Sequence, residues 1–105
     1  MTATPPEHYR NQKNRYPELF KAFESLGETL KQQGPIEAKT AHLIQLAAAA
    51  TLRSEGAVHS HTRRALDAGA TADEIRHALL LLTTTIGFPG VMAAMDWAED
   101  VIEKK

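Results

Sequence analysis

The stretch RSEGAVHSHTRRALDAGAT, residues 53–71, places His59 and His61 two residues apart. An imidazole can give or take a proton near neutral pH, so either side chain could act as a general acid or base. Residues two apart lie about 200° apart around a helix, so the two rings point to opposite sides of it. We expect His59 to lie on the surface in a stripe with Glu55 and Arg63, which leaves His61 as the candidate for chemistry.

Each candidate residue also has a structural interpretation. On a helix face shared with two alanines, His61 could be a buried imidazole bonded to a backbone carbonyl group. Ser54 precedes the expected helix and suits its N-cap, where a hydroxyl oxygen accepts from exposed backbone N–H groups. Arg53, Arg63 and Arg64 could simply be solvated surface charges. The sequence alone leaves the structural and the functional interpretations open.

Metal binding and nucleophilic catalysis have weaker support. His42 and His61 could supply two ligands, but a zinc site usually needs three or four, and no third ligand has diagnostic spacing. The spacing of His59 and His61 brings two ligands to one face on a strand rather than on a helix. No base, orienting acid or oxyanion hole is marked around Ser54. We therefore predict no metal and no cofactor.

The composition bounds the class of protein. A chain of 105 residues has room for one domain with a modest core. Its net charge of -1 gives no long-range attraction to nucleic acid or anionic lipid. It has no cysteine, which excludes disulfides, thiolate ligands and cysteine redox chemistry by this chain alone. The start lacks the features of a signal peptide and the apolar stretches are short, so we expect a cytoplasmic protein that binds neither nucleic acid nor membrane.

Helical spacing of apolar residues predominates, which predicts an all-α domain of about five helices. The Pro-rich residues 1–15 are expected to be frayed or peripheral. A first helix has apolar residues at helical spacing up to Leu30, with Pro17 in its first turn, and ends near Gly34. A second helix is expected from about 37 to 53, and a third from about 55 to 68, ending at Gly69.

A fourth helix is predicted to begin at the capping box formed by Thr71 and Glu74. It is apolar nearly all round as far as Leu82, so it should be buried on more than one side before GFPG ends it. This apolar helix and the alanine-rich face of the second helix present more apolar surface than a small monomer can cover, which predicts a homo-oligomer. A last helix, from about 89 to 103, presents as its buried stripe Val91, Met95, Ala98 and Ile102.

Residues 36–95, IEAKT through VMAAM, resemble the core of the carboxymuconolactone decarboxylase family, which includes the alkylhydroperoxidase D-like proteins. The most specific part runs from His61 to Leu82. It comprises a helix with a histidine, an Arg-rich segment, Ala-Leu-x-x-Gly-Ala-Thr, an acidic pair and a long aliphatic helix. The resemblance implies an all-α fold for the whole chain, with its core at 36–103, and assembly as a trimer or hexamer with sites near subunit contacts.

The hydroperoxidase-like members carry a Cys-x-x-Cys pair, a histidine after it and a glutamate before it. At the matching positions this chain keeps the histidine as His61. It has Ser54 and Ala57 in place of the two cysteines, and His42 in place of the glutamate. In those members a thiolate attacks the peroxide, and neither serine nor alanine can replace it. We therefore predict no thiol peroxidase activity.

The decarboxylase branch also lacks the cysteine pair and keeps a histidine at His61. The resemblance therefore implies a cofactor-free lyase that acts on a small lactone or carboxylic acid. Decarboxylation needs an anion-binding pocket, a donor to the developing enolate-like charge and an acid that protonates the carbon. We expect His61 and His42 to share a cavity in catalytic roles, with Ser54, Arg53 and Arg63 binding substrate. The alternative is a catalytically silent oligomer that binds a small ligand or serves as an accessory subunit.

Overall fold

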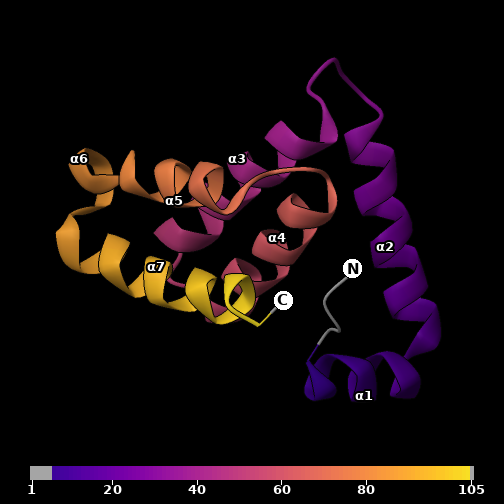
Figure 1. Cartoon of the computed structure of the whole chain (residues 1–105). Helices are drawn as coiled ribbons and strands as arrows, with labels where there is room; N and C mark the ends of the chain where they lie inside the picture. Colours follow the sequence, from indigo (N-terminus) through magenta and orange to yellow (C-terminus); the bar gives the residue numbers. More distant parts are fainter. Residues whose placement is uncertain (1–5, 105) are drawn as a thin grey trace. The chain divides into compact units, whose positions relative to one another are not determined.

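The computed structural model describes residues 6–104, and within them it contains α-helices and no strand (Figure 1). The all-α prediction is confirmed for this range. The described residues form two compact units, 6–37 and 38–104. The prediction that the whole chain, 1–105, is a single domain stays a prediction. The helices are α1 Glu7–Arg15, α2 Pro17–Lys31, α3 Ala38–Thr51, α4 Glu55–Asp67, α5 Ala72–Leu80, α6 Thr83–Ile86 and α7 Phe88–Ile102.

Helix α1 lies within residues 1–15, which were expected to be frayed or peripheral. It buries no residue, and its sequence has no apolar stripe from which a helix could have been predicted. Helix α1 is stabilised by contacts with α2. The rings of Tyr9 and Phe20 pack edge to face with centroids 5.2 Å apart. Glu24 of α2 also accepts a hydrogen bond from Tyr9 at 3.0 Å and pairs with Lys13 at 2.9 Å.

Helix α2 begins with Pro17 in its first turn, as predicted from the sequence. Its apolar side chains recur at helical spacing, yet none is buried in this single chain. The stripe is more than half exposed at Tyr16, Leu19, Phe23, Leu26 and Leu30.

Helices α3, α4, α5 and α7 build the core of the larger unit. Helix α3 packs along α4, and α4 also packs against α7. Small side chains at Ala49, Ala50 and Ala65 are buried in this core, and they let the helices approach closely. The larger side chains that fill it include Leu46, Val58, Ile75 and Leu79. This packing fixes the relative position of the residues on α3 and α4.

The start of α5 is the predicted capping box. The Thr71 hydroxyl oxygen accepts from the Glu74 N–H at 3.0 Å, and the Glu74 carboxylate accepts from the Thr71 N–H at 2.9 Å. The expectation that this helix is buried on more than one side is wrong for the single chain. Ile75 is fully buried, whereas Leu80 at the end of the helix is 47% exposed and Leu81, which follows it, is 64% exposed.

The predicted fourth helix is shorter than expected, and a separate short helix follows it. Helix α5 ends at Leu80, and α6 follows as a separate turn. Gly87, with φ of 90°, then reverses the chain into α7, where Pro89 lies in the first turn. The predicted stripe of α7 is confirmed, with Val91 buried and Met95 partly buried. None of the helices in the described range is long and apolar enough to cross a membrane.

Candidate functional site

The packing of α3 against α4 brings His42 and His61 together. Their Nδ1 atoms are 3.5 Å apart, and their rings have centroids 5.7 Å apart with planes inclined by 37°. His42 is buried, with 6% of its surface exposed, and His61 is partly buried. The two residues expected to be catalytic are therefore close neighbours, which we call the histidine pair.

The contact between two Nδ1 atoms restricts the protonation of the histidine pair. Only one of the two atoms can donate, so for a neutral pair to share this hydrogen bond one ring must carry its proton on Nδ1 and the other on Nε2. A separation of 3.5 Å is at the long limit of a hydrogen bond, so the bond itself is weak. Two imidazolium cations at this distance would repel each other, so the pair favours at most one positive charge. The histidine pair is therefore a candidate for acid–base chemistry.

Two buried polar atoms on the same helices as the histidine pair have no hydrogen-bond partner among the described residues. They are Oγ1 of Thr62, which follows His61, and Oε1 of Gln45, one turn after His42 on the same side of α3. A buried polar atom left without a partner costs about 1–3 kcal/mol, so these two atoms reduce the stability of α3 and α4. Threonine and glutamine within a helix carry no distinguishing spacing, so neither unpartnered atom could be predicted from the sequence.

Ser54 and Arg53 lie at the turn between α3 and α4, away from the histidine pair. The Ser54 hydroxyl oxygen accepts from the Ala57 N–H at 3.3 Å, so Ser54 is the N-cap of α4. Ser54 precedes His61 by two helical turns, which is about 10 Å along the axis. Arg53 has a left-handed backbone with φ of 55°, and its Nη2 lies 3.7 Å from the place of a Cβ at Gly90 on α7. The chain does not bring either residue to the histidines, and their substrate-binding roles stay predictions.

Arg63 is partly buried and lies two residues after His61. Because residues two apart point to different sides of a helix, its backbone position directs it away from the contact between His61 and α3. Its role in substrate binding also stays a prediction.

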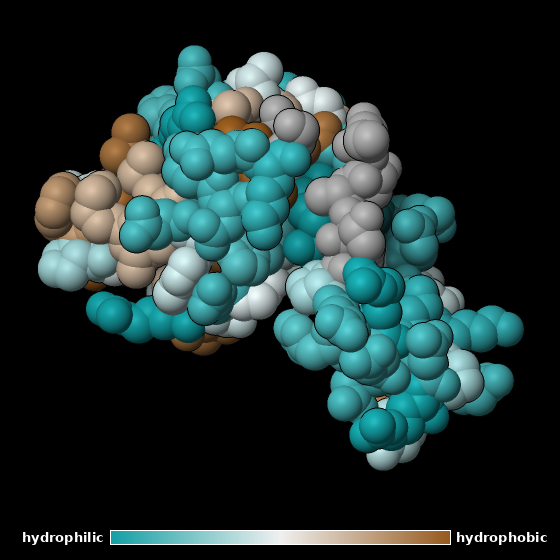
Figure 2. All heavy atoms as spheres, turned by 60° about the horizontal axis from the view of Figure 1, so that its bottom comes forward, coloured by the Kyte–Doolittle hydropathy of each residue, from teal (hydrophilic) through white to brown (hydrophobic). Residues whose placement is uncertain are grey.

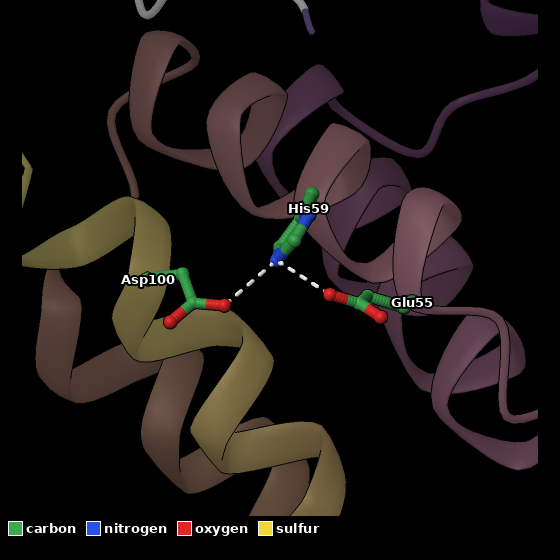
Figure 3. A group of neighbouring side chains, drawn as sticks. All are labelled: Glu55, His59 and Asp100. Atoms are coloured by element: carbon green, nitrogen blue, oxygen red, sulfur yellow. Dashed lines mark hydrogen bonds and ion pairs between the residues drawn. The ribbon is translucent and has the colours of Figure 1, made fainter.

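His59 is partly exposed and lies beside Glu55, as expected, and it also contacts a residue of α7. Its Nε2 lies 3.0 Å from Oδ2 of Asp100 on α7 and 4.0 Å from Oε2 of Glu55 on its own helix (Figure 3). Only 20% of the His59 side chain is exposed. The predicted neighbour Glu55 is present, but Asp100 was missed because it lies on a distant part of the chain.

Ion pairs fix the helices that support the histidine pair. Lys39 on α3 pairs with Glu74 on α5 at 3.2 Å, and Arg76 on α5 holds both oxygens of Glu99 on α7 at 2.6 and 3.1 Å. Hydrogen bonds from Arg76 lower the pKa of Glu99, and the same bonds raise the pKa of Arg76. The pKa of Glu74 is lowered first by the backbone N–H of Thr71 and then by Lys39.

The fold and the site together define an all-helical protein in which a histidine of α4 faces a side chain of α3. Known proteins share this fold. The Carboxymuconolactone decarboxylase family matches residues 17–100. A crystal structure of an apo carboxymuconolactone decarboxylase family protein from Legionella pneumophila superimposes with a TM-score of 0.75 at 26% identity. That alignment covers 91% of this chain and 86% of the other.

Two curated relatives are uncharacterized proteins. One, from Methanocaldococcus jannaschii, is 28% identical over 92 residues, which span 88% of this chain and 86% of the relative. The other, from Haemophilus influenzae, is 37% identical over 51 residues, which span 49% of this chain and 45% of the relative. The family match covers most of the chain, so the chain belongs to the carboxymuconolactone decarboxylase family. It is a member without any cysteine.

Proposed function

We propose that this protein is a cofactor-free lyase that removes carbon dioxide from a small lactone or carboxylic acid, with His61 and His42 handling the proton. The observation that carries this proposal is the 3.5 Å contact between the two Nδ1 atoms. Family membership supports the reaction class. The absence of cysteine removes the thiolate on which the peroxidase chemistry of the family depends.

The reaction needs one proton and no redox partner. The bond between the carboxylate carbon and its neighbour breaks, and the electron pair passes into the adjacent carbonyl system as an enolate while carbon dioxide leaves. An imidazole N–H of the histidine pair stabilises the developing charge and then transfers its proton to the carbon. Solvent water restores that proton. Because the histidine pair favours at most one positive charge, His42 can assist by accepting or donating at Nδ1 as the charge on His61 changes.

A substrate carboxylate needs a cation, and we propose that assembly completes the site. Within one chain Arg53 lies at the far turn of α4, near Gly90, rather than at the histidines. A trimer or hexamer could place an arginine of a second copy near the histidine pair, as the family's sites near subunit contacts imply. The substrate-binding roles of Ser54, Arg53 and Arg63 are proposed on this basis.

Exposed apolar side chains support an oligomer. Figure 2 shows hydrophobic residues gathered at its left end, which is the α6 end of the larger unit in Figure 1. Leu52, Leu81 and Phe88 of this unit are all more than 60% exposed in the single chain. Patches of this kind in soluble proteins mark interaction surfaces. We also propose a cytoplasmic location and a small carboxylate or lactone as the binding partner, with neither nucleic acid nor membrane bound.

The proposal is tested by following carbon dioxide release from a panel of small lactone acids. His61→Gln keeps the size of the side chain but loses the acid, so turnover should fall by a factor on the order of 10² to 10⁴. His77→Gln, at an exposed histidine of α5, is the matched control and should leave the rate unchanged. Ligand binding without any turnover in the wild-type protein would instead favour the catalytically silent alternative.

A further inference from the structure

We propose that Glu55, His59 and Asp100 form a binding site for a divalent transition-metal ion such as zinc. We call these three residues the α4–α7 cluster. Each offers one ligand atom, and the three atoms all lie within 4.8 Å of one another. Figure 3 shows the imidazole of His59 placed between the two carboxylates, one from its own helix and one from α7.

The arrangement arises from helix geometry and from the packing of α4 on α7. Glu55 and His59 stand four residues apart, so they share one face of α4. Asp100 reaches this face from α7 and already orients the imidazole through the 3.0 Å contact with Nε2. Ligand atoms about 2 Å from a tetrahedral zinc ion stand about 3.3 Å from one another. The observed separations of 3.0 and 4.0 Å therefore need only small side-chain movements to accept the ion.

The donor set indicates the class of cation. Imidazole nitrogen suits zinc, copper and nickel, whereas calcium and magnesium take oxygen ligands. The two carboxylates of the α4–α7 cluster balance the charge of a divalent ion. Both carboxylate side chains are more than half exposed, so an ion can reach them and water can fill its remaining positions. We expect a dissociation constant on the order of 1–100 μM, weaker than that of a closed four-ligand site.

The α4–α7 cluster is separate from the histidine pair. His59 and His61 leave opposite sides of α4, and they contact α7 and α3 respectively. A bound ion would therefore cross-link α4 to α7 without touching the proposed catalytic residues. Because only the folded chain brings Asp100 to His59, the ion should stabilise the fold as its concentration rises above the dissociation constant.

The test is calorimetric titration of zinc into chelator-treated, tag-free protein. We expect one ion bound per chain, with at least about tenfold weaker binding in His59→Gln, Glu55→Gln and Asp100→Asn. His77→Gln and His61→Gln are matched histidine controls and should bind zinc like the wild type. Zinc should also raise the melting temperature of the wild type by several degrees but not that of Glu55→Gln. The exposed side chain of Glu55 makes that variant the one least able to disturb folding.

Three results would overturn the proposal. The first is that the wild type binds no zinc at concentrations up to about 1 mM. The second is that His59→Gln and Glu55→Gln bind zinc as tightly as the wild type. The third is that zinc binding is lost in His61→Gln alone, which would place the ion at the histidine pair.

Discussion

His59 and His61 lie two residues apart on α4 and contact different helices. His61 faces His42 of α3, with 3.5 Å between their Nδ1 atoms, whereas His59 contacts Asp100 of α7 at 3.0 Å. The helical repeat that turns the two rings apart therefore separates two polar contacts within one short segment. Substitutions at these neighbouring positions should have different consequences.

His59→Gln should keep carbon dioxide release within about twofold of the wild type, because the ring lies on the side of α4 away from the histidine pair. It should lower the free energy of unfolding by about 1 kcal/mol, since it weakens the contact with Asp100. Thermal unfolding and turnover measured on the same preparation check both parts. Lost turnover at unchanged stability would place the catalytic site on the α7 side.

The folded protein should not be monomeric at micromolar concentration. Exposed leucines of the larger unit and Phe88 are not covered by any part of the single chain. Light scattering should give a trimer or a hexamer, and Leu81→Asp should shift the population toward smaller species without disturbing the core. A single 11.5 kDa species for the wild type would show this prediction to be wrong.

The protein should not reduce hydroperoxides with dithiol reductants. Ser54 and Ala57 stand where the hydroperoxidase-like members have their cysteines, and neither can form a sulfenic acid. The measurement is peroxide consumption with a dithiol, compared with a protein-free blank and repeated after chelator treatment. Turnover that survives the chelator would require a chemistry outside this account.

Acid should destabilise the fold partly through Glu99. Its pKa is lowered from 4.5 by hydrogen bonds from Arg76, so its stabilising contribution is complete above about pH 4.5 and is lost as pH falls through the folded-state pKa. Glu99→Gln should therefore be less stable than the wild type at pH 7, and the difference should shrink toward pH 3. Urea unfolding at several pH values checks this, and a difference independent of pH would contradict it.

Local signals in the sequence predicted most of the larger unit. The capping box at Thr71, the left-handed Gly69 with φ of 102° and the apolar stripe of α7 all act within a few residues of one helix. Helix α1 escaped prediction because its stabilising contacts come from Tyr9 and Glu24 rather than from an apolar stripe. Within one chain α5 is less buried than predicted, because an apolar sequence does not say whether the same chain or another covers it.

The candidate site was only partly predictable. Helix geometry made His61 a candidate, and the resemblance to a family supported it and added His42. Their proximity follows from the packing of α3 on α4. Asp100 stands 41 residues from His59 and meets it only through the tertiary packing of α7, which no local pattern encodes. For the same reason the side-chain orientation of Arg53 toward Gly90 could not be foreseen.

The central claim is that His42 and His61 act together on a small carboxylate or lactone. Its most direct test is an NMR titration of the imidazole nitrogens with a panel of lactones and carboxylic acids. The account predicts that at least one compound shifts the signals of both His42 and His61 while those of His59 and His77 stay in place. The claim would be contradicted if every compound that binds shifted only the signals of His59. It would also be contradicted if no compound shifted the signals of any imidazole.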